Sequence, residues 1–439
     1  MKNYLLVTLS SVLALASNAI QAVPDIQHWV TPNGARVYFV EAAEIPIIDV
    51  RVSFAAGGAR DEAKPGLAKL VSRLLTEGAG ELNANLFSER LAQTGAIFAT
   101  GARRDMAWLS LRSLSEKQYS EPALALLQSA LSSPRFDQDA FDRGQAKALV
   151  DIRREQQSPA AIANKAFYLA VYGDHPYAAP LTGTEDSVTA ISRENVVAFH
   201  RRYYVANNAS VAIVGAVSRA EAEGIALALC AGLRSGAAAA ALNPVAMLPR
   251  AANQHIEFPS IQSHVRIGQP GLKRGDPDYF PLLVGNHVLG GGGLVSILFD
   301  EIREKRGLSY SVYSHFSPMA ELGPFTASLQ TDNSQTEQAI AVLRGELQKF
   351  VANGPTPNAL EAAKQNLIGG FPLRISSNAK TIEYLAMIGF YRLPLDYLQT
   401  FADHVARVTL ADVRSAFSRR LDPDKMITIV VGRPRAEDG

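Results

Sequence analysis

Cysteine is almost missing from this sequence, since Cys230 is the single one among 439 residues. No internal disulfide can form, so the folded chain must depend on a large hydrophobic core. The chain also has no large excess of positive or negative charge, because its net charge is +1. Its lysines and arginines are scattered along the sequence. This distribution argues against nucleic acid or another polyanion as the partner.

Closely spaced histidines are also absent. No two of the eight histidines stand three or four residues apart: they are His28, His175, His200, His255, His264, His287, His315 and His404. A helical histidine pair that holds zinc from one face is therefore excluded, whereas a zinc site assembled from distant residues stays open. The sequence also lacks the Gly-x-Ser-x-Gly motif of serine hydrolases. The glycine run at 290–293 is not followed by Gly-Lys-Ser/Thr, which argues against a phosphate-binding loop.

Long hydrophobic runs are missing after the N-terminus. Residues 1–22 combine a basic start, an apolar run from Tyr4 to Ala16 and small residues, with cleavage expected after Ala22 or Ala19. This pattern is typical of a secretory signal peptide. The run is too short to cross a bilayer, which disfavours the alternative of an uncleaved anchor. We therefore expect an exported protein that has no membrane attachment once the signal is removed.

The sequence does contain two copies of one unit. Strand patterns open each copy, at residues 35–40 and 48–54 in the first and at 255–258 and 264–268 in the second. Each copy ends in an apolar strand that is closed by a glycine, Gly215 or Gly432, and these glycines stand 217 positions apart. Ser192 and Thr409 are the predicted N-caps of the helices that precede these last strands. A repeat of this length indicates a duplicated domain.

The chain is too long for a single hydrophobic core, so we expect at least two domains. We predict an N-terminal domain at 23–234, a linker at 235–250 and a C-terminal domain at 251–439. The linker contains a run of alanines between Ser-Gly and Asn-Pro pairs. The uneven mixture of strands and helices predicts an α+β fold with two homologous domains, each a mostly antiparallel sheet packed against helices.

Residues 55–68 lead into a predicted helix and read Ala-Ala-Gly-Gly-Ala-Arg-Asp-Glu-Ala-Lys-Pro-Gly-Leu-Ala. This segment resembles the stretch before the zinc motif of pitrilysin/insulinase-type (inverzincin) peptidases. That family includes the mitochondrial processing peptidase subunits and bacterial periplasmic homologues. Its active members carry His-x-x-Glu-His, in which two histidines hold zinc and the glutamate takes a proton from metal-bound water. The resemblance covers residues 29–432 and implies that the two domains form half of a clamshell chamber.

At the positions of that motif this sequence has Lys69, Ser72 and Arg73. Lysine and arginine are positively charged at neutral pH and cannot serve as ordinary zinc ligands, and serine cannot replace a carboxylate base. The third ligand of the family is a glutamate that should fall at Val150 or Asp151, so Asp151 is the candidate. The resemblance therefore implies a degenerate zinc motif and no metal in this chain. Lys69 and Arg73 are then either solvated or fill the vacated pocket and pair with Asp151.

Residues 289–313 carry the most specific part of the resemblance. A glycine run precedes a predicted helix that ends at Gly307, and a strand follows. In the family, an arginine and a tyrosine at this spacing bind the substrate backbone near the scissile bond, and Arg303 and Tyr310 match them. A guanidinium offers forked donors to a peptide carbonyl, and a phenol can donate to a developing oxyanion. On the local pattern alone, Arg303 would be a surface charge and Tyr310 a core residue.

The resemblance implies a non-catalytic, substrate-binding subunit of a heterodimeric zinc metalloendopeptidase that acts on peptides in the periplasm. Such a chain is inactive alone, and the zinc belongs to a homologous catalytic partner. The alternative is a catalytically silent peptide-binding or scaffolding protein. Residues 96–101 and 106–111 stand where the family has an edge strand that accepts an extended peptide. Arg103 and Arg104, which interrupt this stretch, could instead protect an exposed edge.

Overall fold

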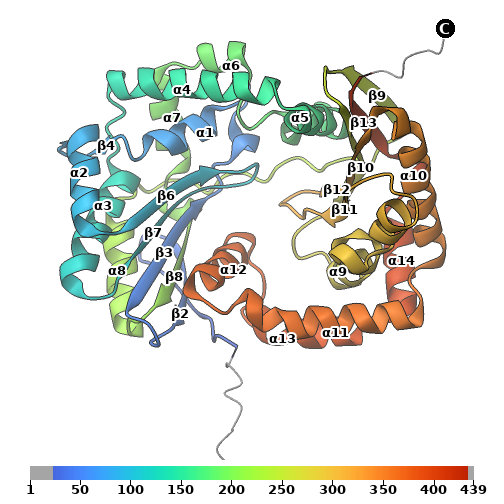
Figure 1. Ribbon diagram of the computed structural model, residues 1–439. Coiled ribbons are helices and arrows are strands. Elements are labelled where there is room, and N and C mark those ends of the chain that lie inside the picture. Colours follow the sequence, from blue (N-terminus) through green and yellow to red (C-terminus); the bar gives the residue numbers. More distant parts are fainter. Residues whose placement is uncertain (1–22, 434–439) are drawn as a thin grey trace, which may run out of the picture.

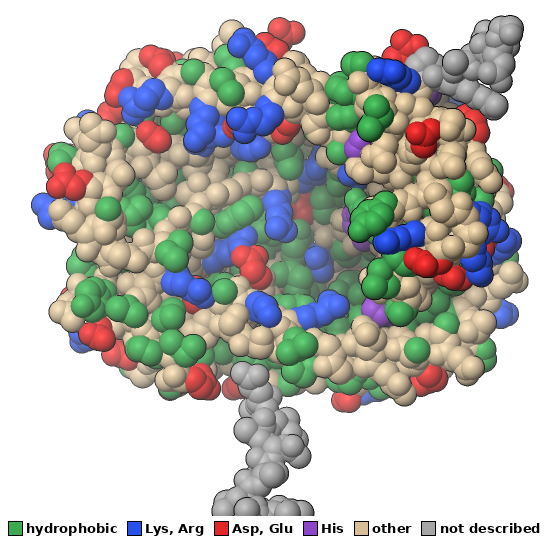
Figure 2. Space-filling view, in the orientation of Figure 1, with side chains coloured by type: hydrophobic (Ala, Val, Ile, Leu, Met, Phe, Trp, Pro, Cys, Tyr) green, Lys and Arg blue, Asp and Glu red, His purple; other side chains and the backbone are tan. Residues whose placement is uncertain are grey.

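The computed structural model describes residues 23–433, so the predicted signal peptide at 1–22 lies outside the described residues. Two β-sheets lie in different halves of the molecule, and helices form an outer wall around them (Figure 1). The space-filling view shows a central hollow as a depression in the middle of the face (Figure 2). Within residues 23–433, no helix combines the length and the apolar character that crossing a bilayer requires.

The first sheet is built by residues of the first half of the chain, which we define as 23–234. Its strand order is β1-β2-β8-β3-β7-β6, and every neighbouring pair is antiparallel except β2 and β8. The strands are β1 (Gln27–Val30), β2 (Arg36–Glu41), β3 (Ile47–Phe54), β6 (Ile97–Ala102), β7 (Ala107–Leu114) and β8 (Ala209–Gly215). A separate short hairpin is formed by β4 (Gly78–Ala79) and β5 (Leu82–Asn83).

The second sheet is built by the second half, which we define as 251–433. Its order is β11-β12-β10-β13-β9, and only β9 and β13 run parallel. The strands are β9 (Ala252–Glu257), β10 (Gln262–Leu272), β11 (Ser311–Phe316), β12 (Gly323–Asp332) and β13 (Ile427–Gly432). In both sheets the first long strand of the half pairs parallel with the last one, which confirms the predicted duplication.

The two closing glycines play the same part in both sheets. A Cβ at Gly215 would lie 2.3 Å from the carbonyl oxygen of Ile47, and one at Gly432 would lie 2.5 Å from Oγ of Ser263. Ile47 begins β3 and Ser263 lies near the start of β10, so both glycines end their strand against the equivalent neighbour. The repeat of these glycines therefore reflects a close backbone approach that a side chain would prevent.

Helices surround both sheets. Those of the first half are α1 (Leu67–Leu74), α2 (Ala84–Thr94), α3 (Lys117–Ser132), α4 (Gln138–Gln156), α5 (Pro159–Tyr172), α6 (Glu185–Thr189), α7 (Arg193–Tyr203) and α8 (Arg219–Ala231). Those of the second half are α9 (Tyr279–Asn286), α10 (Thr336–Asn353), α11 (Pro357–Arg374), α12 (Asn378–Tyr391), α13 (Tyr397–Arg407) and α14 (Leu410–Arg420). Ser192 and Thr409 form the predicted N-caps, each within a reciprocal capping box.

One helix of each half packs against the sheet of the other half. Helix α12 packs on β8 and β3 of the first sheet, and helix α5 packs on β13 and β10 of the second. The contacts are close, because a Cβ at Gly389 of α12 would lie 2.5 Å from the Tyr38 ring. A Cβ at Gly268 of β10 would likewise lie 2.9 Å from the Phe167 ring of α5. The exchange covers the sheet faces that the helices of the same half leave open.

The predicted fold class is confirmed, with two mostly antiparallel sheets packed against helices. The segment at 235–250, predicted as the linker, contains no helix and no extended strand. Its apolar residue Val245 is buried and belongs to the cluster around α5. The connection between the halves is therefore packed along the protein surface rather than looped away from it.

Candidate functional site

Helix α1 carries the three residues that match the zinc motif. The buried carboxylate of Asp61 begins this helix by accepting hydrogen bonds from the backbone N–H of Gly66 at 2.8 Å and of Ala68 at 2.7 Å. Burial raises the pKa of Asp61 to about 7, and the backbone amides act in the opposite direction. The cap fixes where α1 begins, and therefore which face of the helix carries Lys69 and Arg73.

Lys69 and Arg73 lie one helical turn apart, and Arg73 forms an ion pair with Asp151 of α4. The hydrogen bond from Arg73 lowers the pKa of Asp151, and the charge of Lys69 adds to this effect. The three side chains surround a cavity of about 10 Å³, which is about the room that one water molecule needs. Val150 is 52% exposed, so Asp151 rather than Val150 faces α1. Arg73 thus occupies the space between the two helices.

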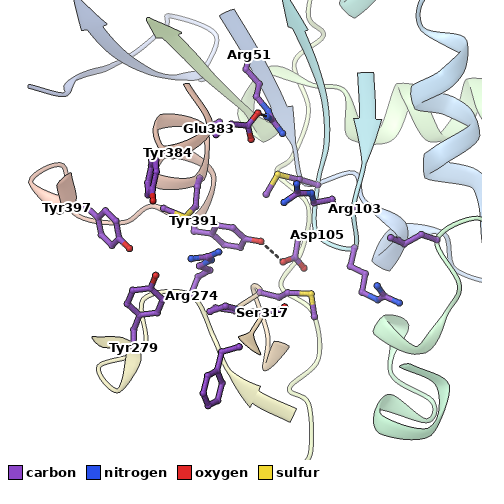
Figure 3. Close-up of a pocket in the computed structure, with 18 of the residues that line it drawn as sticks. Arg51, Arg103, Asp105, Arg274, Tyr279, Ser317, Glu383, Tyr384, Tyr391 and Tyr397 are labelled. Atoms are coloured by element: carbon purple, nitrogen blue, oxygen red, sulfur yellow. Dashed lines mark hydrogen bonds and ion pairs between the residues drawn. The ribbon is translucent and has the colours of Figure 1, made fainter. Parts of the chain in front are cut away.

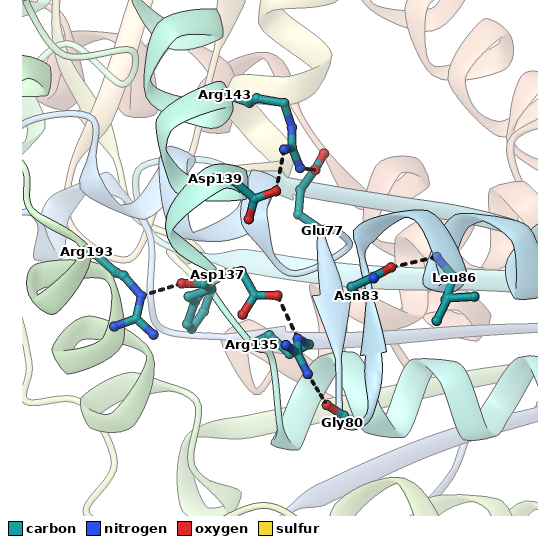
Figure 4. Close-up of polar contacts among 10 residues, drawn as sticks. Glu77, Gly80, Asn83, Leu86, Arg135, Asp137, Asp139, Arg143 and Arg193 are labelled. Atoms are coloured by element: carbon teal, nitrogen blue, oxygen red, sulfur yellow. Dashed lines mark hydrogen bonds and ion pairs between the residues drawn. The ribbon is translucent and has the colours of Figure 1, made fainter.

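Helix α4 reaches α1 through a glycine contact and an anchored N-terminus. A Cβ at Gly144 would lie 2.7 Å from a Leu74 methyl group, so any larger residue there would require the Leu74 side chain to shift. Before the helix, Arg135 pairs with Asp137 at 2.7 Å and Arg193 donates to the Phe136 carbonyl at 2.5 Å (Figure 4). Within its first turns, Arg143 pairs with Asp139 at 2.8 Å. These contacts set the register that brings Asp151 to Arg73.

The residues at this position do not fit a zinc ion. Two of the three ligand positions hold cations, and Arg73 already neutralises the single carboxylate. Ser72, at the position of the catalytic base, is 2% exposed, and its hydroxyl has no partner within residues 23–433. Across that same range, no three His, Cys, Asp or Glu side chains gather closely enough to hold a metal ion. The site therefore has neither the donors nor the base that activation of water requires.

Arg303 and Tyr310 lie together in the second half. Arg303 lies near the end of a π-helical segment (Phe299–Glu304), and Gly307, whose φ is 62°, donates its backbone N–H to the Arg303 carbonyl at 2.9 Å. Nη1 of Arg303 donates to the Tyr310 carbonyl at 3.2 Å, and its guanidinium lies 4.2 Å from the Tyr310 ring centre. The two predicted substrate-binding residues are thus held as one unit.

The exposure of Tyr310 decides between the two interpretations of this residue. Its side chain is 79% exposed, so the alternative that it belongs to the core is wrong. Within residues 23–433 its hydroxyl donates to no other group, whereas the ring rests against Arg303. An exposed aromatic ring that is fixed by a guanidinium and carries a free hydroxyl is suited to contact with a ligand.

Two adjoining cavities open into the hollow between the halves. The first, of about 560 Å³, is lined from both halves and contains arginines and tyrosines, among them Arg103, Arg274 and Tyr391 (Figure 3). The second, of about 510 Å³, is lined by the glycine-rich segment and by β11, and shares Arg274 with the first. The two cavities share lining residues, and each has the size that ligand sites usually have.

Sequence reasoning missed the residue that connects the walls of the first cavity. Asp105 is buried and lies in the loop between β6 and β7. Its carboxylate accepts hydrogen bonds from the Tyr177 hydroxyl at 2.5 Å, the Tyr391 hydroxyl at 2.8 Å and the Ala320 backbone N–H at 2.8 Å. Burial raises the pKa values of both tyrosines. No local pattern marks Asp105, because its partners are distant in the sequence.

One edge strand of each sheet leads to or lines these cavities. Strand β6 is the last strand of the first sheet, and β11 is the last strand of the second. Arg103 follows β6 directly and lines the first cavity, while Tyr313 and His315 of β11 line the second. An edge strand has unpaired backbone donors and acceptors, so each border can accept an extended peptide as an added strand. This arrangement agrees with the edge strand expected at residues 96–101.

Comparison with known proteins gives consistent matches along the chain. Residues 36–185 match the family described as insulinase (peptidase family M16), and residues 190–367 match the peptidase M16 inactive domain. The crystal structure of a peptidase M16 inactive domain from Pseudomonas fluorescens is 38% identical in sequence, with a TM-score of 0.91 over 94% of this chain and 99% of that one. A protease from Helicobacter pylori shares the fold, with a TM-score of 0.86 at 18% identity over 93% and 99% of the two chains.

Curated relatives differ in how they are described. The non-peptidase homolog YmxG of Helicobacter pylori is 25% identical over 91% of this chain and 92% of its own length. The uncharacterized zinc protease SCO5738 of Streptomyces coelicolor is 27% identical over 82% of this chain and 79% of its own length. Relatives named as a protease and as a non-peptidase are thus both similar in sequence to this chain, so the site residues have to distinguish the two functions.

Proposed function

Because the chain belongs to the insulinase family of M16 peptidases and lacks the residues of the zinc motif, we propose that it is the non-catalytic, substrate-binding subunit of a heterodimeric zinc endopeptidase. The chain is an inactive homologue of this family. In the proposed complex it contributes substrate contacts, and a homologous partner contributes zinc, base and water. The pair encloses peptides in a chamber, of which this chain forms one half.

The ion pair between Arg73 and Asp151 carries the proposal. It joins a cation at a ligand position to the carboxylate that would otherwise complete a metal site. Two charges that neutralise each other across α1 and α4 give the segment a stable structure without metal. An isolated chain with this arrangement has no means to generate a nucleophilic water at neutral pH.

The unit formed by Arg303 and Tyr310 supports the substrate-binding role. Tyr310 is 79% exposed, and its hydroxyl makes no hydrogen bond within residues 23–433. The adjoining edge strand β11 and the edge strand β6 offer backbone groups along which an extended peptide can lie. A peptide held on these edges would run past Tyr310, and its hydroxyl could donate to an oxyanion formed at the active site of the partner.

The proposed location is the periplasm, which rests on the signal-like residues 1–22. We therefore propose that the mature chain should be isolated from the periplasm of its native cell together with its partner. The decisive experiment is co-purification with a tag on the mature chain, followed by zinc analysis of the complex and of the isolated chain. The expected result is zinc in the complex, none in the isolated chain, and chelator-sensitive peptide cleavage by the complex alone.

Variants of the complex test the assigned roles. Tyr310→Phe and Arg303→Gln should slow peptide cleavage by about tenfold or more, because each removes a donor that acts on the reacting peptide. Neither variant should lower the zinc content. Arg306→Gln is the matched control, since Arg306 lies in the same segment and pairs with Glu301 at 2.6 Å instead of Tyr310. Chelator-sensitive peptidase activity of the isolated chain would refute the proposal.

A silent peptide-binding protein is the second candidate, because both sheet edges and both cavities are formed by this one chain. A single chain can therefore hold a peptide without a partner. Under this alternative, peptides bind to the isolated chain, but no zinc-bearing homologue co-purifies with it. The gene neighbourhood separates the two candidates as well, since an adjacent gene for a homologue with an intact His-x-x-Glu-His motif favours the heterodimer.

A further inference from the structure

The walls of the central hollow carry far more positive charge than the rest of the molecule. The net charge of the whole chain is only +1. The two adjoining cavities, however, are lined by five arginines and two carboxylates: Arg51, Arg103, Arg104, Arg274, Arg374, Asp105 and Glu383. Blue side chains gather around the hollow in the space-filling view (Figure 2). The positive charge is thus concentrated where a ligand would enter.

Both carboxylates of these walls already have partners. Asp105 accepts hydrogen bonds from two tyrosine hydroxyls and one backbone N–H, and Glu383 forms an ion pair with Arg51. By contrast, Arg103 and Arg274 form no ion pair within residues 23–433, although both line the first cavity. Nε of Arg274 is buried and has no hydrogen-bond partner in the same range. The cavity therefore holds guanidinium groups that lack anionic partners.

Two of the arginines that line the first cavity, Arg51 and Arg103, lie close to the same aromatic ring. The indole ring of Trp108 lies 4.4 Å from the guanidinium of Arg51 and 5.6 Å from that of Arg103. Arg51 is 5% exposed, and its Nε has no partner within residues 23–433. Burial lowers the pKa of Arg51, Glu383 raises it, and the nearby charge of Arg103 adds to the lowering. Two like charges next to one aromatic ring repel each other, and an anion bound beside them would offset this repulsion. Glu383 alone does not neutralise both.

A third guanidinium reaches the same space from the second half. Arg274 lies 5.6 Å from the ring centre of Tyr391 and lines both cavities. In the close-up, Arg274 lies beside Tyr391, with Arg103 beyond Asp105 (Figure 3). An anion in the first cavity would therefore be approached from both halves of the chain. Forked guanidinium donors suit the two oxygens of a carboxylate.

We propose that the chamber selects peptides with acidic side chains, whose carboxylates are bound by Arg103 and Arg274. This inference rests on the proposed function, because it names the class of peptide that the chain presents. Strand β6 ends immediately before Arg103. A peptide paired with the β6 edge consequently brings its following side chains to the guanidinium groups. The surrounding tyrosines, Tyr279, Tyr384 and Tyr397, add apolar contact area beside the charged positions.

The test uses the purified full-length mature chain and three fluorescent peptides of equal length. One peptide carries glutamates, the second has glutamine at the same positions, and the third has lysine. Fluorescence anisotropy gives each Kd over a series of salt concentrations. At low salt, the Kd of the acidic peptide should be lower than that of the glutamine peptide by about tenfold or more. The reason is that each glutamate can form a charge-assisted contact with a guanidinium in a partly enclosed site, whereas glutamine cannot. The preference should decrease as salt increases.

Variants locate the preference. Arg103→Gln/Arg274→Gln should abolish the advantage of the acidic peptide and leave the affinity for the glutamine peptide within about twofold, since backbone pairing along β6 does not involve these side chains. Arg90→Gln is the matched control, because Arg90 is exposed on α2 at the outer wall and should leave all three affinities unchanged. Circular dichroism and thermal midpoints would verify that the variants remain folded.

The outcomes separate the inference from the proposed function. Equal affinity for the three peptides, or preference for the lysine peptide, overturns acidic selection and leaves peptide binding intact. An acidic preference that survives Arg103→Gln/Arg274→Gln also overturns it, because the charge would then be recognised elsewhere. Failure of every peptide to bind to the chain, alone and in the co-purified complex, overturns the proposed function and the inference together.

Discussion

The Asp105 carboxylate accepts a hydrogen bond from the Tyr391 hydroxyl at 2.8 Å, although the two residues stand 286 positions apart in the chain. The same carboxylate accepts from Tyr177 and from the backbone of Ala320, which lies before β12. One buried side chain therefore joins the β6–β7 loop and the segment around Tyr177 to two elements of the second half. This junction keeps the two halves together at the wall of the central cavity.

Replacement of Asp105 by asparagine should weaken this junction. The amide keeps the shape of the carboxylate but places an NH₂ group where donors already converge, so at least one buried polar group loses its partner. We expect the unfolding free energy to fall by about 1–3 kcal/mol, measured as a lower thermal midpoint and a lower denaturant midpoint. Tyr310→Phe is the control, because its exposed hydroxyl makes no hydrogen bond within residues 23–433. Equal stability of the two variants would contradict the assigned role of Asp105.

The sequence predicted those features that depend on neighbouring residues. Ser192 and Thr409 were identifiable as N-caps, because a capping box is formed by residues three positions apart. Gly215 and Gly432 were identifiable because they close two similar strands. The ion pair of Arg73 with Asp151 was one of two alternatives that the sequence left open, and the structure shows this pair. Lys69, in contrast, forms no ion pair with Asp151.

Features that depend on distant residues were not predictable in this way. The exchange of α5 and α12 between the sheets leaves no local signal, because both helices have the ordinary pattern of a buried helix. The Asp105 junction likewise joins segments whose proximity follows only from the complete fold. The arginines of the hollow come from β3, the β6–β7 loop, the segment after β10 and the end of α11. Their convergence is a property of the assembled halves and not of any stretch of sequence.

The close packing of α12 on the first sheet predicts that a single added methyl group at Gly389 destabilises the protein. In Gly389→Ala, the new Cβ would lie 2.5 Å from the Tyr38 ring and 2.7 Å from Oγ of Ser210. Because α12 cannot move away from the sheet without opening its core, we expect a loss of about 1–3 kcal/mol in unfolding free energy from overpacking. Urea unfolding followed by circular dichroism measures this change.

Gly345 provides the matched control for this substitution. It lies within helix α10, and a Cβ there would meet nothing within 4 Å. Gly345→Ala should therefore stabilise the protein by up to about 1 kcal/mol, since alanine favours the helix. If both variants changed stability in the same direction, the close contact between α12 and the first sheet would have no energetic significance.

The degenerate motif predicts that a metal site can be restored by two substitutions. In Lys69→His/Arg73→His, two imidazoles one turn apart join Asp151, which Arg73 no longer neutralises. Three protein ligands are the usual number for a catalytic zinc site. We expect the double variant to bind one zinc ion per chain. At a free zinc concentration of about 100 times Kd, binding should stabilise the fold by about 2.7 kcal/mol, and a chelator should reverse this effect.

Arg73→His alone is the control for zinc binding, because it provides only one histidine and one carboxylate and keeps the charge of Lys69. It should bind zinc much more weakly than the double variant. Metal analysis after gel filtration gives the stoichiometry. Absence of zinc from the double variant would show that α1 and Asp151 no longer keep the spacing of a metal site.

The buried His200 predicts a specific dependence of stability on pH. Its ring is 8% exposed, donates through Nε2 to the Leu131 carbonyl at 3.0 Å and stacks on Tyr204. Burial lowers the pKa of His200 from 6.5 to about 4. Below pH 6.5, His200 is protonated in the unfolded chain, whereas it stays neutral in the folded chain down to about pH 4. Stability should therefore fall as the pH decreases from about 6.5 to about 4, by about 3 kcal/mol at most.

His200→Gln isolates this contribution, because glutamine can still donate a hydrogen bond but does not titrate. Asp61, whose pKa burial raises to about 7, acts in the opposite direction over an overlapping range, since its raised pKa favours the folded state at lower pH. The useful quantity is therefore the difference in unfolding free energy between wild type and His200→Gln at each pH. As the pH falls below 6.5, the unfolding free energy of the wild type should decrease relative to that of His200→Gln. This relative loss should level off near pH 4. A constant difference between pH 4 and pH 8 would mean that folded His200 accepts a proton as readily as the unfolded chain does.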